Sequence, residues 1–214
     1  MEKSLFSRGR FSEMPVVGIV RGISFDDMRE ILPLYLASGL RTIEITMNTA
    51  QSDKIIRYAA GRFGEQLNIG AGTVCSPEDL TIALDAGAGF IVSPIVSEKV
   101  IGICRQHHVP VFPGAYTATE IYEAWSAGAD MVKVFPSPTP SYIRDILAPF
   151  DQIKLLPTGG INYENCLDFL KAGAAGLGIG SHLFNKEHIR NKNWEALARE
   201  FERFVHKIAE YKRV

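Results

Sequence analysis

The sequence predicts an α/β protein folded as a (β/α)8 TIM barrel, with a short N-terminal helical arm and a C-terminal helix. Eight short, continuously apolar segments alternate with segments of helical pattern, which is typical of a parallel sheet covered by helices. Eight such units within 214 residues fit a closed barrel at the small end of its size range. An open doubly wound sheet is the alternative, but no GxGxxG motif follows the first apolar segment.

Each element has its own signal in the chain. The first fourteen residues are expected to form the arm, outside the repeating pattern. The expected strands are apolar, partly β-branched runs, at residues 15–20, 42–47, 68–72, 90–92, 109–112, 131–136, 153–156 and 177–179. The expected helices lie after them, at residues 25–37, 53–62, 77–86, 98–107, 119–127, 142–147, 162–172 and 194–211.

The helix ends are marked most clearly. Ser24 and Ser76 are placed as N-caps, and Pro77 follows Ser76 at the first helical position, ahead of two acids. Several helices close on a small residue followed by glycine, which the left-handed C-cap favours. These glycines are Gly39, Gly87, Gly128 and Gly173. Their spacing of roughly 40 residues corresponds to two βα units each time.

Composition limits the classes of function. The chain is 46% hydrophobic and 22% charged, so a single domain over residues 1–214 is expected. A formal net charge of −1 without runs of like charge argues against nucleic acid and membrane partners. Three widely spaced cysteines without a CxxC motif indicate a reducing cytoplasm. No signal peptide or membrane span is expected.

Lys133 is the residue that least fits its surroundings. It lies in the apolar run 131–136, where a desolvated ammonium is costly unless it is paired or neutralised. A neutral lysine amine is a nucleophile toward carbonyl carbons. The alternative interpretation is a lysine at a strand end whose ammonium reaches water.

Polar residues gather where the expected strands end, and in a barrel this is the face that carries the chemistry. Glu44 interrupts the second strand as Lys133 interrupts the sixth, and a barrel directs both toward one interior. The two form either a structural ion pair or a base beside an amine nucleophile. The other residues at strand ends are Arg21, Asn48, Thr73, Ser93, Thr158, Gly159, Gly160, Gly180 and Ser181.

Two glycine-containing loops predict a phosphate site. Gly159-Gly160 and Gly180-Ser181 follow the seventh and eighth strands, where barrels often bind phosphate through backbone N–H groups. Ordinary tight turns are the alternative. Arg21 is expected to bind a carboxylate or the same phosphate, unless it is a plain surface charge. The five histidines lack the spacing of metal ligands, so no metal site is expected.

Short motifs stand in order, one at the end of each expected strand from the second to the eighth. They are Glu44-Ile45-Thr46, Gly70-Ala71-Gly72-Thr73-Val74, Ser93-Pro94, Pro113-Gly114, Lys133-Val134-Phe135-Pro136, Pro157-Thr158-Gly159-Gly160 and Gly180-Ser181. Together they resemble the class I aldolases of 2-keto-3-deoxy-6-phosphogluconate (KDPG) and 4-hydroxy-2-oxoglutarate (KHG), over residues 15–184.

The resemblance implies a lyase that cleaves a 2-keto-3-deoxy-6-phospho sugar acid to pyruvate and glyceraldehyde 3-phosphate, or KHG to pyruvate and glyoxylate. It implies that Lys133 forms the Schiff base and Glu44 is the general acid/base, without a metal or organic cofactor. The resemblance also implies a homotrimer, which is typical of the family. The expected substrate-binding residues are Arg21, Asn48, Thr73, Pro94, Phe135 and Thr158, and the expected phosphate-binding residues are Gly159, Gly160, Gly180 and Ser181.

The chain departs from the family pattern at Asn48, where many members carry an arginine that helps hold the substrate carboxylate. Asn48, residues 115–120 and residues 177–181 resemble the 2-keto-3-deoxy-6-phosphogalactonate (KDPGal) branch. Thr158 instead resembles the phosphogluconate branch, because the galactonate branch tends to carry valine there. A KDPGal-specific aldolase is therefore the alternative, and Arg21 is the candidate to replace the missing guanidinium.

Two further functions remain open from the residues. A sugar-phosphate epimerase or decarboxylase barrel would use Lys133 as a charge rather than as a covalent carrier. A catalytically silent barrel would bind a phosphorylated acid as a sensor, although the presence of both Glu44 and Lys133 argues against it.

Overall fold

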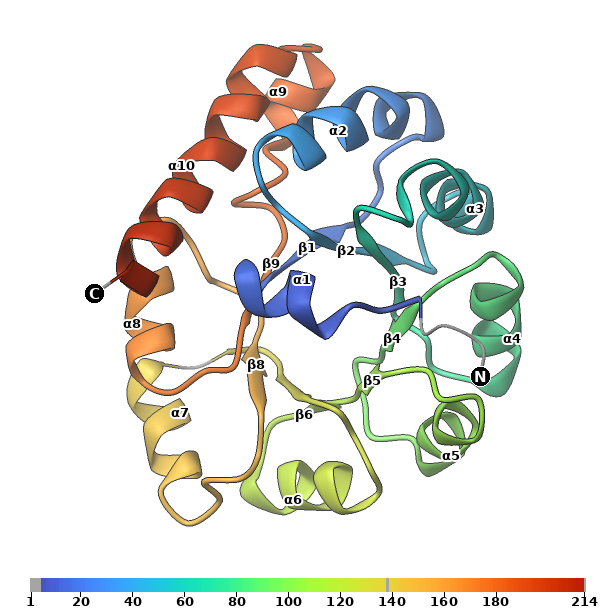
Figure 1. The fold of residues 1–214 in the computed structure, drawn as a ribbon. Coiled ribbons are helices and arrows are strands. Elements are labelled where there is room, and N and C mark those ends of the chain that lie inside the picture. Colours follow the sequence, from blue (N-terminus) through green and yellow to red (C-terminus); the bar gives the residue numbers. More distant parts are fainter. Residues whose placement is uncertain (1–4, 138, 214) are drawn as a thin grey trace.

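The computed structural model describes residues 5–137 and 139–213. Its strands are all parallel and curl into a barrel surrounded by helices (Figure 1). The strands are β1 Val16–Val20, β2 Thr42–Thr46, β3 Asn68–Gly72, β4 Phe90–Val92, β5 Val111–Phe112, β6 Gly114–Ala115, β7 Val132–Val134, β8 Leu155–Pro157 and β9 Leu177–Ile179.

Two sheets make up the barrel wall. One has the order β5-β4-β3-β2-β1-β9 and the other has the order β6-β7-β8. A parallel bridge between Thr158 and Gly178 joins β8 to β9, and the chain passes directly from β5 to β6 through Pro113. The expected α/β barrel is confirmed.

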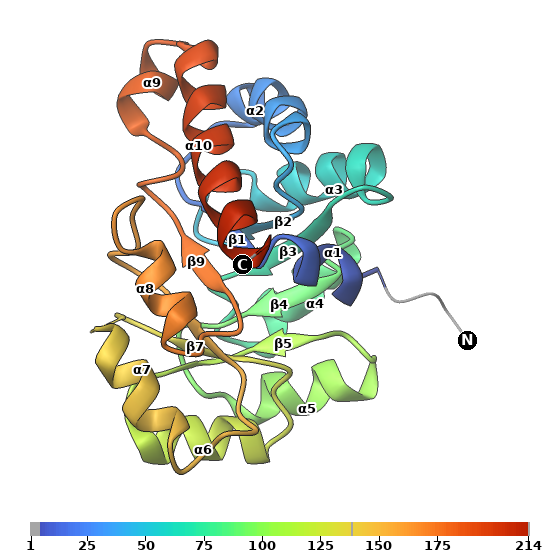
Figure 2. The same cartoon turned by 60° about the vertical axis from the view of Figure 1, so that its left-hand side comes forward.

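The helices lie outside the wall, except for α1, which crosses the amino end of the barrel (Figure 1). In Figure 2, α10 lies along the outside of the barrel, where it packs against α2. The helices are α1 Arg8–Glu13, α2 Phe25–Ala37, α3 Ser52–Phe63, α4 Pro77–Asp85, α5 Glu98–Gln106, α6 Ala118–Ser126, α7 Pro140–Leu147, α8 Cys166–Lys171, α9 Lys186–Arg190 and α10 Trp194–Arg213. None of the described helices is both long and apolar enough to cross a bilayer.

Three local expectations were wrong. The fifth strand ends at Phe112 as expected but begins at Val111 instead of residue 109, and beyond Pro113, which has no N–H to donate, an unexpected strand β6 pairs Gly114 with Lys133. The helix expected from residue 162 begins four residues later, because Asn162 and Asn165 accept each other's backbone N–H groups in a turn. The short helix α9 was not expected at all.

Side chains on the strands divide the core into two layers. Outward-facing residues such as Ile43, Ile45 and Val132 pack against the surrounding helices. Inward-facing strand residues join Phe6 and Phe11 of the N-terminal arm in a second cluster, rich in aromatic rings. Its members are Phe6, Phe11, Val17, Ile19, Phe90, Val92, Phe112, Met131 and Leu156. This cluster fills the barrel interior at the amino ends of the strands, and the polar groups lie at the carboxyl ends.

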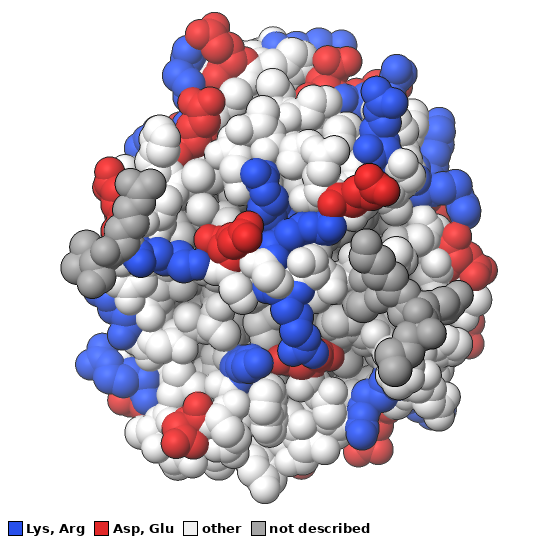
Figure 3. Space-filling model, viewed as in Figure 1, with Lys and Arg blue, Asp and Glu red and all other residues white. Residues whose placement is uncertain are grey.

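The helix α1 closes the amino end through hydrogen bonds as well as packing. The Asn68 amide binds both backbone groups of Ser7, the N-cap of α1. Arg8 forms a salt bridge with Asp130 at 2.6 Å, and Arg10 donates to the carbonyl oxygen of Glu65. Figure 3 shows this face, on which positive and negative side chains are interspersed.

Candidate active site

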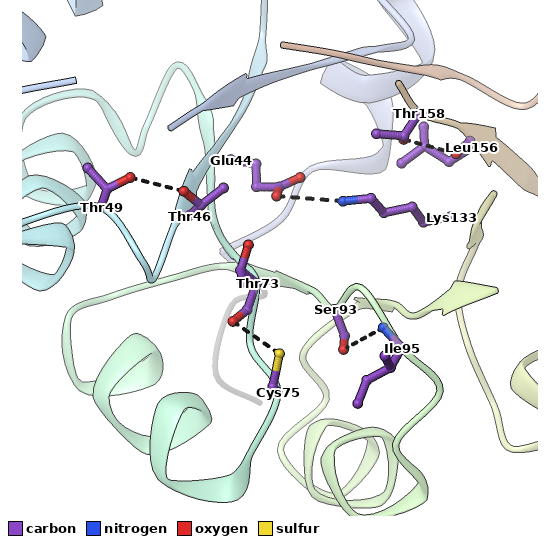
Figure 4. Close-up of polar contacts among 10 residues, drawn as sticks. All are labelled: Glu44, Thr46, Thr49, Thr73, Cys75, Ser93, Ile95, Lys133, Leu156 and Thr158. Atoms are coloured by element: carbon purple, nitrogen blue, oxygen red, sulfur yellow. Dashed lines mark hydrogen bonds and ion pairs between the residues drawn. The ribbon is translucent and has the colours of Figure 1, made fainter. Parts of the chain in front are cut away.

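Lys133 and Glu44 meet inside the barrel. Lys133 lies on β7 and Glu44 on β2, and they are only 5% and 1% exposed. The Lys133 Nζ atom is 4.0 Å from the Glu44 Oε1 atom, and Figure 4 shows the two side chains reaching toward each other. Both point inward because their strand neighbours point outward into the helix-facing core.

The environment of Glu44 favours its protonated form. Neither carboxylate oxygen has a hydrogen-bond partner among the described residues. Burial raises the pKa of Glu44, and the positive charges of Lys133 and then Arg21 oppose this effect. A carboxyl group whose pKa lies above its usual range is suited to give and take a proton near neutral pH.

A cavity of about 980 Å³ opens above the pair at the carboxyl end of the strands. Eight of the twelve expected site residues line it: Arg21, Lys133, Phe135, Thr158, Gly159, Gly160, Gly180 and Ser181. Glu44, Asn48, Thr73 and Pro94 are not part of the cavity wall. The described structure therefore brings the expected phosphate loops and the lysine together, while Glu44 lies buried against Lys133.

The four residues outside the wall differ in their placement. Asn48 is exposed in the turn after β2, and no side-chain hydrogen bond is seen for it among the described residues. Thr73 directly follows β3, and Figure 4 shows it near Glu44. Its φ of +58° is uncommon for a residue with a side chain, and such strain often marks a functional site. Pro94 is partly buried in the loop after β4.

The glycine loop after β8 has a backbone conformation that only glycine adopts readily. Gly159 and Gly160 have φ values of +92° and +71°, in the region that favours glycine. The Phe135 ring packs over Gly159, and the Lys133 Nζ lies 5.5 Å from the centroid of that ring. The Thr158 hydroxyl donates to the Leu156 carbonyl oxygen at 3.2 Å. Its hydrogen is therefore directed at the backbone and not at the cavity.

Sequence reasoning missed Thr49, which holds two strand-end loops together. Its Oγ1 atom accepts the Gly22 N–H at 3.0 Å and lies 3.0 Å from the Thr46 Oγ1 atom. Thr49 is buried, so this link fixes the backbone beside Arg21. Two threonines three residues apart at the end of a buried strand were the only signal in the sequence.

Sequence reasoning also missed the charged residues of α9. Lys186, Glu187 and Arg190 line the outer part of the cavity, yet nothing in their sequence context predicted a helix beside the phosphate loops. Within the described residues, no group of three or more His, Cys, Asp and Glu side chains is placed to hold a metal ion.

A parallel barrel with a buried lysine–carboxylate pair beneath a glycine-lined cavity is the arrangement that the sequence predicts for a barrel lyase. Comparison with known proteins gives the family. The family model of KDPG and KHG aldolase matches residues 8–200. The chain therefore belongs to the KDPG and KHG aldolase family, and it is an aldolase.

Individual relatives agree with this assignment. The chain is 34% identical to the 2-dehydro-3-deoxy-6-phosphogalactonate aldolase of Escherichia coli, over 81% of this chain and 86% of that one. The native KDPGal structure has a TM-score of 0.88 and 31% identity, covering 94% of this chain and 97% of that one. The KDPG aldolase of Legionella pneumophila has a TM-score of 0.83 and 28% identity, covering 90% and 95%. That structure holds pyruvate captured as a covalent carbinolamine intermediate.

Proposed function

We propose that this aldolase cleaves a 2-keto-3-deoxy-6-phospho sugar acid to pyruvate and glyceraldehyde 3-phosphate through a Schiff base on Lys133. The observation that supports this most directly is the Lys133–Glu44 pair, 4.0 Å apart and shielded from water. An amine there can attack a carbonyl carbon, and a proton carrier is already beside it.

The reaction follows from these two groups. The neutral amine of Lys133 adds to the C2 carbonyl of the keto acid, and loss of water gives an iminium ion. Glu44 in its carboxylate form takes the proton of the C4 hydroxyl, directly or through a water molecule. The C3–C4 bond then breaks, its electron pair enters the enamine, and the aldehyde leaves. Protonation at C3 and hydrolysis release pyruvate and restore the free lysine.

The remaining residues hold the substrate on either side of Lys133. Gly159, Gly160, Gly180 and Ser181 bind the phosphate through backbone N–H groups and a hydroxyl group. The other substrate-binding residues are Arg21, Asn48, Thr73, Pro94, Phe135 and Thr158, of which Thr73 and Pro94 line the keto-acid site and Phe135 packs beside it. The mechanism needs no metal or organic cofactor, because the iminium ion itself is the electron sink.

The galactonate epimer is the second candidate substrate. The KDPGal relative and structure described above favour it, and the Thr158 hydroxyl is engaged by Leu156. A threonine in this state presents an apolar surface similar to that of valine. The shorter KHG is a third candidate. We also propose a homotrimer in the cytoplasm; the exposed apolar side chains of Ile95, Tyr116 and Tyr122 are compatible with such an assembly.

The test is pyruvate release from KDPG, KDPGal and KHG, together with borohydride trapping of the pyruvate adduct. We expect a reduced adduct on Lys133, and we expect Lys133→Ala to abolish it while the fold survives. An adduct mapped by mass spectrometry to another lysine would refute the assignment. An epimerase or decarboxylase would form no adduct.

Removal of the substrate phosphate should lower kcat/KM more than a change of epimer does. Two glycine loops provide several backbone N–H groups for a dianion, whereas the epimers differ at one hydroxyl. The unphosphorylated keto-deoxy acid should therefore lose more kcat/KM than the wrong epimer. Equal kcat/KM with and without phosphate would contradict the phosphate-loop interpretation and favour KHG.

A further inference from the structure

Strand β3 has two glycines on the face that points into the barrel, so other side chains can lie directly against its backbone. Ile69 and Ala71 face outward into the helix-facing core, so Gly70 and Gly72 face inward. A Cβ atom built on Gly70 would lie 2.4 Å from the Phe90 ring, and one built on Gly72 would meet Glu44. The two glycines therefore make room for different groups, one in the aromatic cluster and one in the active site.

Among the described glycines, Gly72 is the one at which an added Cβ atom would come closest to a neighbouring atom. An added Cβ atom would lie 1.7 Å from Glu44 Oε1, 2.3 Å from Cδ and 2.5 Å from Cγ. All three distances are far below van der Waals contact, so the Glu44 side chain lies flat against the bare backbone of β3. The φ angle of Gly72 is not in the left-handed region, so its backbone conformation is open to any residue. Space for Glu44 is the reason that the structure gives for glycine here.

We propose that Gly72 is a positioning residue for the aldolase reaction, because its missing side chain fixes where the Glu44 carboxyl group lies. This inference rests on the proposed role of Glu44. Neither Glu44 oxygen is held by a hydrogen bond within the described structure, so packing and the charge of Lys133 position the carboxyl group. If an added Cβ atom at residue 72 displaced the Glu44 side chain from β3, no hydrogen-bond donor among the described residues would hold Oε1 at its distance of 4.0 Å from the Lys133 Nζ atom.

A double-mutant cycle on stability tests the contact between residues 72 and 44. Gly72→Ala should lower the melting temperature of the protein. In a Glu44→Ala background the three nearest atoms are gone, so the same substitution should have little effect. Recovery of folding in Glu44→Ala/Gly72→Ala would support the proposal even where Gly72→Ala alone does not fold. An equal decrease in melting temperature in both backgrounds would overturn it.

A second measurement separates positioning from general damage to β3. With pyruvate as the probe, Gly72→Ala should keep the borohydride-trapped adduct on Lys133. It should lose exchange of the pyruvate C3 protons in heavy water, by about 100-fold, as expected for a catalytic group displaced by an ångström. Gly70→Ala is the matched control, because it crowds the same strand but faces Phe90. It should keep the exchange rate below its melting temperature.

The outcomes distinguish this proposal from the one on which it rests. Unchanged exchange in Glu44→Gln would show that Glu44 is not the proton carrier, and the stability cycle would still decide whether Gly72 accommodates it. Loss of exchange in Glu44→Gln but not in folded Gly72→Ala would overturn only the role of Gly72.

Discussion

The two ends of the barrel interior are built on opposite principles. At the amino end, Phe6, Phe90 and Phe112 pack with ring centroids 5.4 to 5.9 Å apart, in the range of favourable aromatic pairs. At the carboxyl end, Glu44 and Lys133 are equally buried, but two carboxylate oxygens have no hydrogen-bond partner in the described structure. The amino end stabilises the fold, and this stability allows the carboxyl end to keep a costly polar pair.

Glycines on β3 serve both ends. Gly70 accommodates the Phe90 ring and Gly72 accommodates the Glu44 side chain, only two residues further along the same strand. Side chains of opposite chemistry are thus placed by the same device, the removal of a Cβ atom. The two ends of the barrel therefore differ in the side chains that pack against β3, an aromatic ring at one end and a carboxyl group at the other, and not in the strand itself.

The largest expected effect is on catalysis at the carboxyl end. Glu44→Gln should keep iminium formation but lower kcat by roughly 10²- to 10⁴-fold, because an amide cannot carry the proton. Steady-state turnover and borohydride trapping on the same preparation measure the two effects. Normal turnover with an intact adduct would mean that another group is the base.

At the amino end a substitution should act on stability instead. Phe112→Ala removes a ring that is 1% exposed, and it should cost about 3–5 kcal/mol of the free energy of unfolding. Denaturant unfolding measures this loss, and the borohydride adduct should form normally in the folded fraction. If Phe112→Ala specifically prevented adduct formation in folded protein, the two ends would not be separable.

A smaller effect of opposite sign is expected when the polar pair is replaced. Glu44→Leu combined with Lys133→Met substitutes apolar groups of similar volume, which often stabilises a protein by about 1–4 kcal/mol. The double variant should therefore be inactive but more resistant to denaturant. Each single substitution should be less stable than the double variant, since it leaves one buried group without its partner. A double variant less stable than the native protein would show that the pair also holds the fold.

The gain in the double variant should depend on pH. The ordinary pKa of Glu44 is 4.5 and burial raises it in the folded state, so above pH 4.5 the native protein binds more protons than the unfolded chain. The stability that protonated Glu44 provides is fully present below 4.5 and is lost as the pH rises through its higher native pKa. The advantage of the double variant should therefore grow with pH across this window, which unfolding curves at several pH values would show.

The sequence predicted the barrel because its pattern is local and repeated. Apolar strands recur in every unit, and helix caps and closing glycines recur in several of them, so an error at one place, such as the unexpected strand β6 after Pro113, did not change the fold. Glu44 and Lys133 were found because charged residues in apolar strands are rare and a barrel directs both inward. Their separation of 4.0 Å was not predictable, since it depends on the curvature of the closed sheet.

Other parts of the site could not be predicted, because they depend on contacts between distant residues. Nothing around Gly72 in the sequence shows that Glu44 lies against it, and nothing around Thr49 shows that it accepts the Gly22 N–H. The charged residues of α9 reach the cavity only because β9 and the following loop bring them there. These are properties of packing rather than of pattern.

The smallest effect that we expect concerns Arg21, at the rim of the carboxyl end. Arg21 lines the cavity, and its charge is close enough to oppose the raised pKa of Glu44. Thr49 holds the backbone of the neighbouring Gly22, so the loop that carries Arg21 has a fixed position. Asn48 lies exposed in the adjoining loop after β2. These placements support the hypothesis that Arg21 holds the substrate carboxylate in place of an arginine at position 48.

Arg21→Lys tests this hypothesis at constant charge. A guanidinium gives a carboxylate two parallel hydrogen bonds that a lysine ammonium cannot reproduce, so pyruvate binding should weaken by roughly tenfold, the equivalent of one such bond. Adding Asn48→Arg should restore part of the affinity for pyruvate, because the neighbouring loop then supplies a guanidinium group to the carboxylate. Titration of pyruvate against adduct formation measures both. No change in Arg21→Lys, or a liganded structure with the guanidinium more than about 6 Å from every substrate anion and so outside hydrogen-bond range, would make Arg21 an ordinary rim charge.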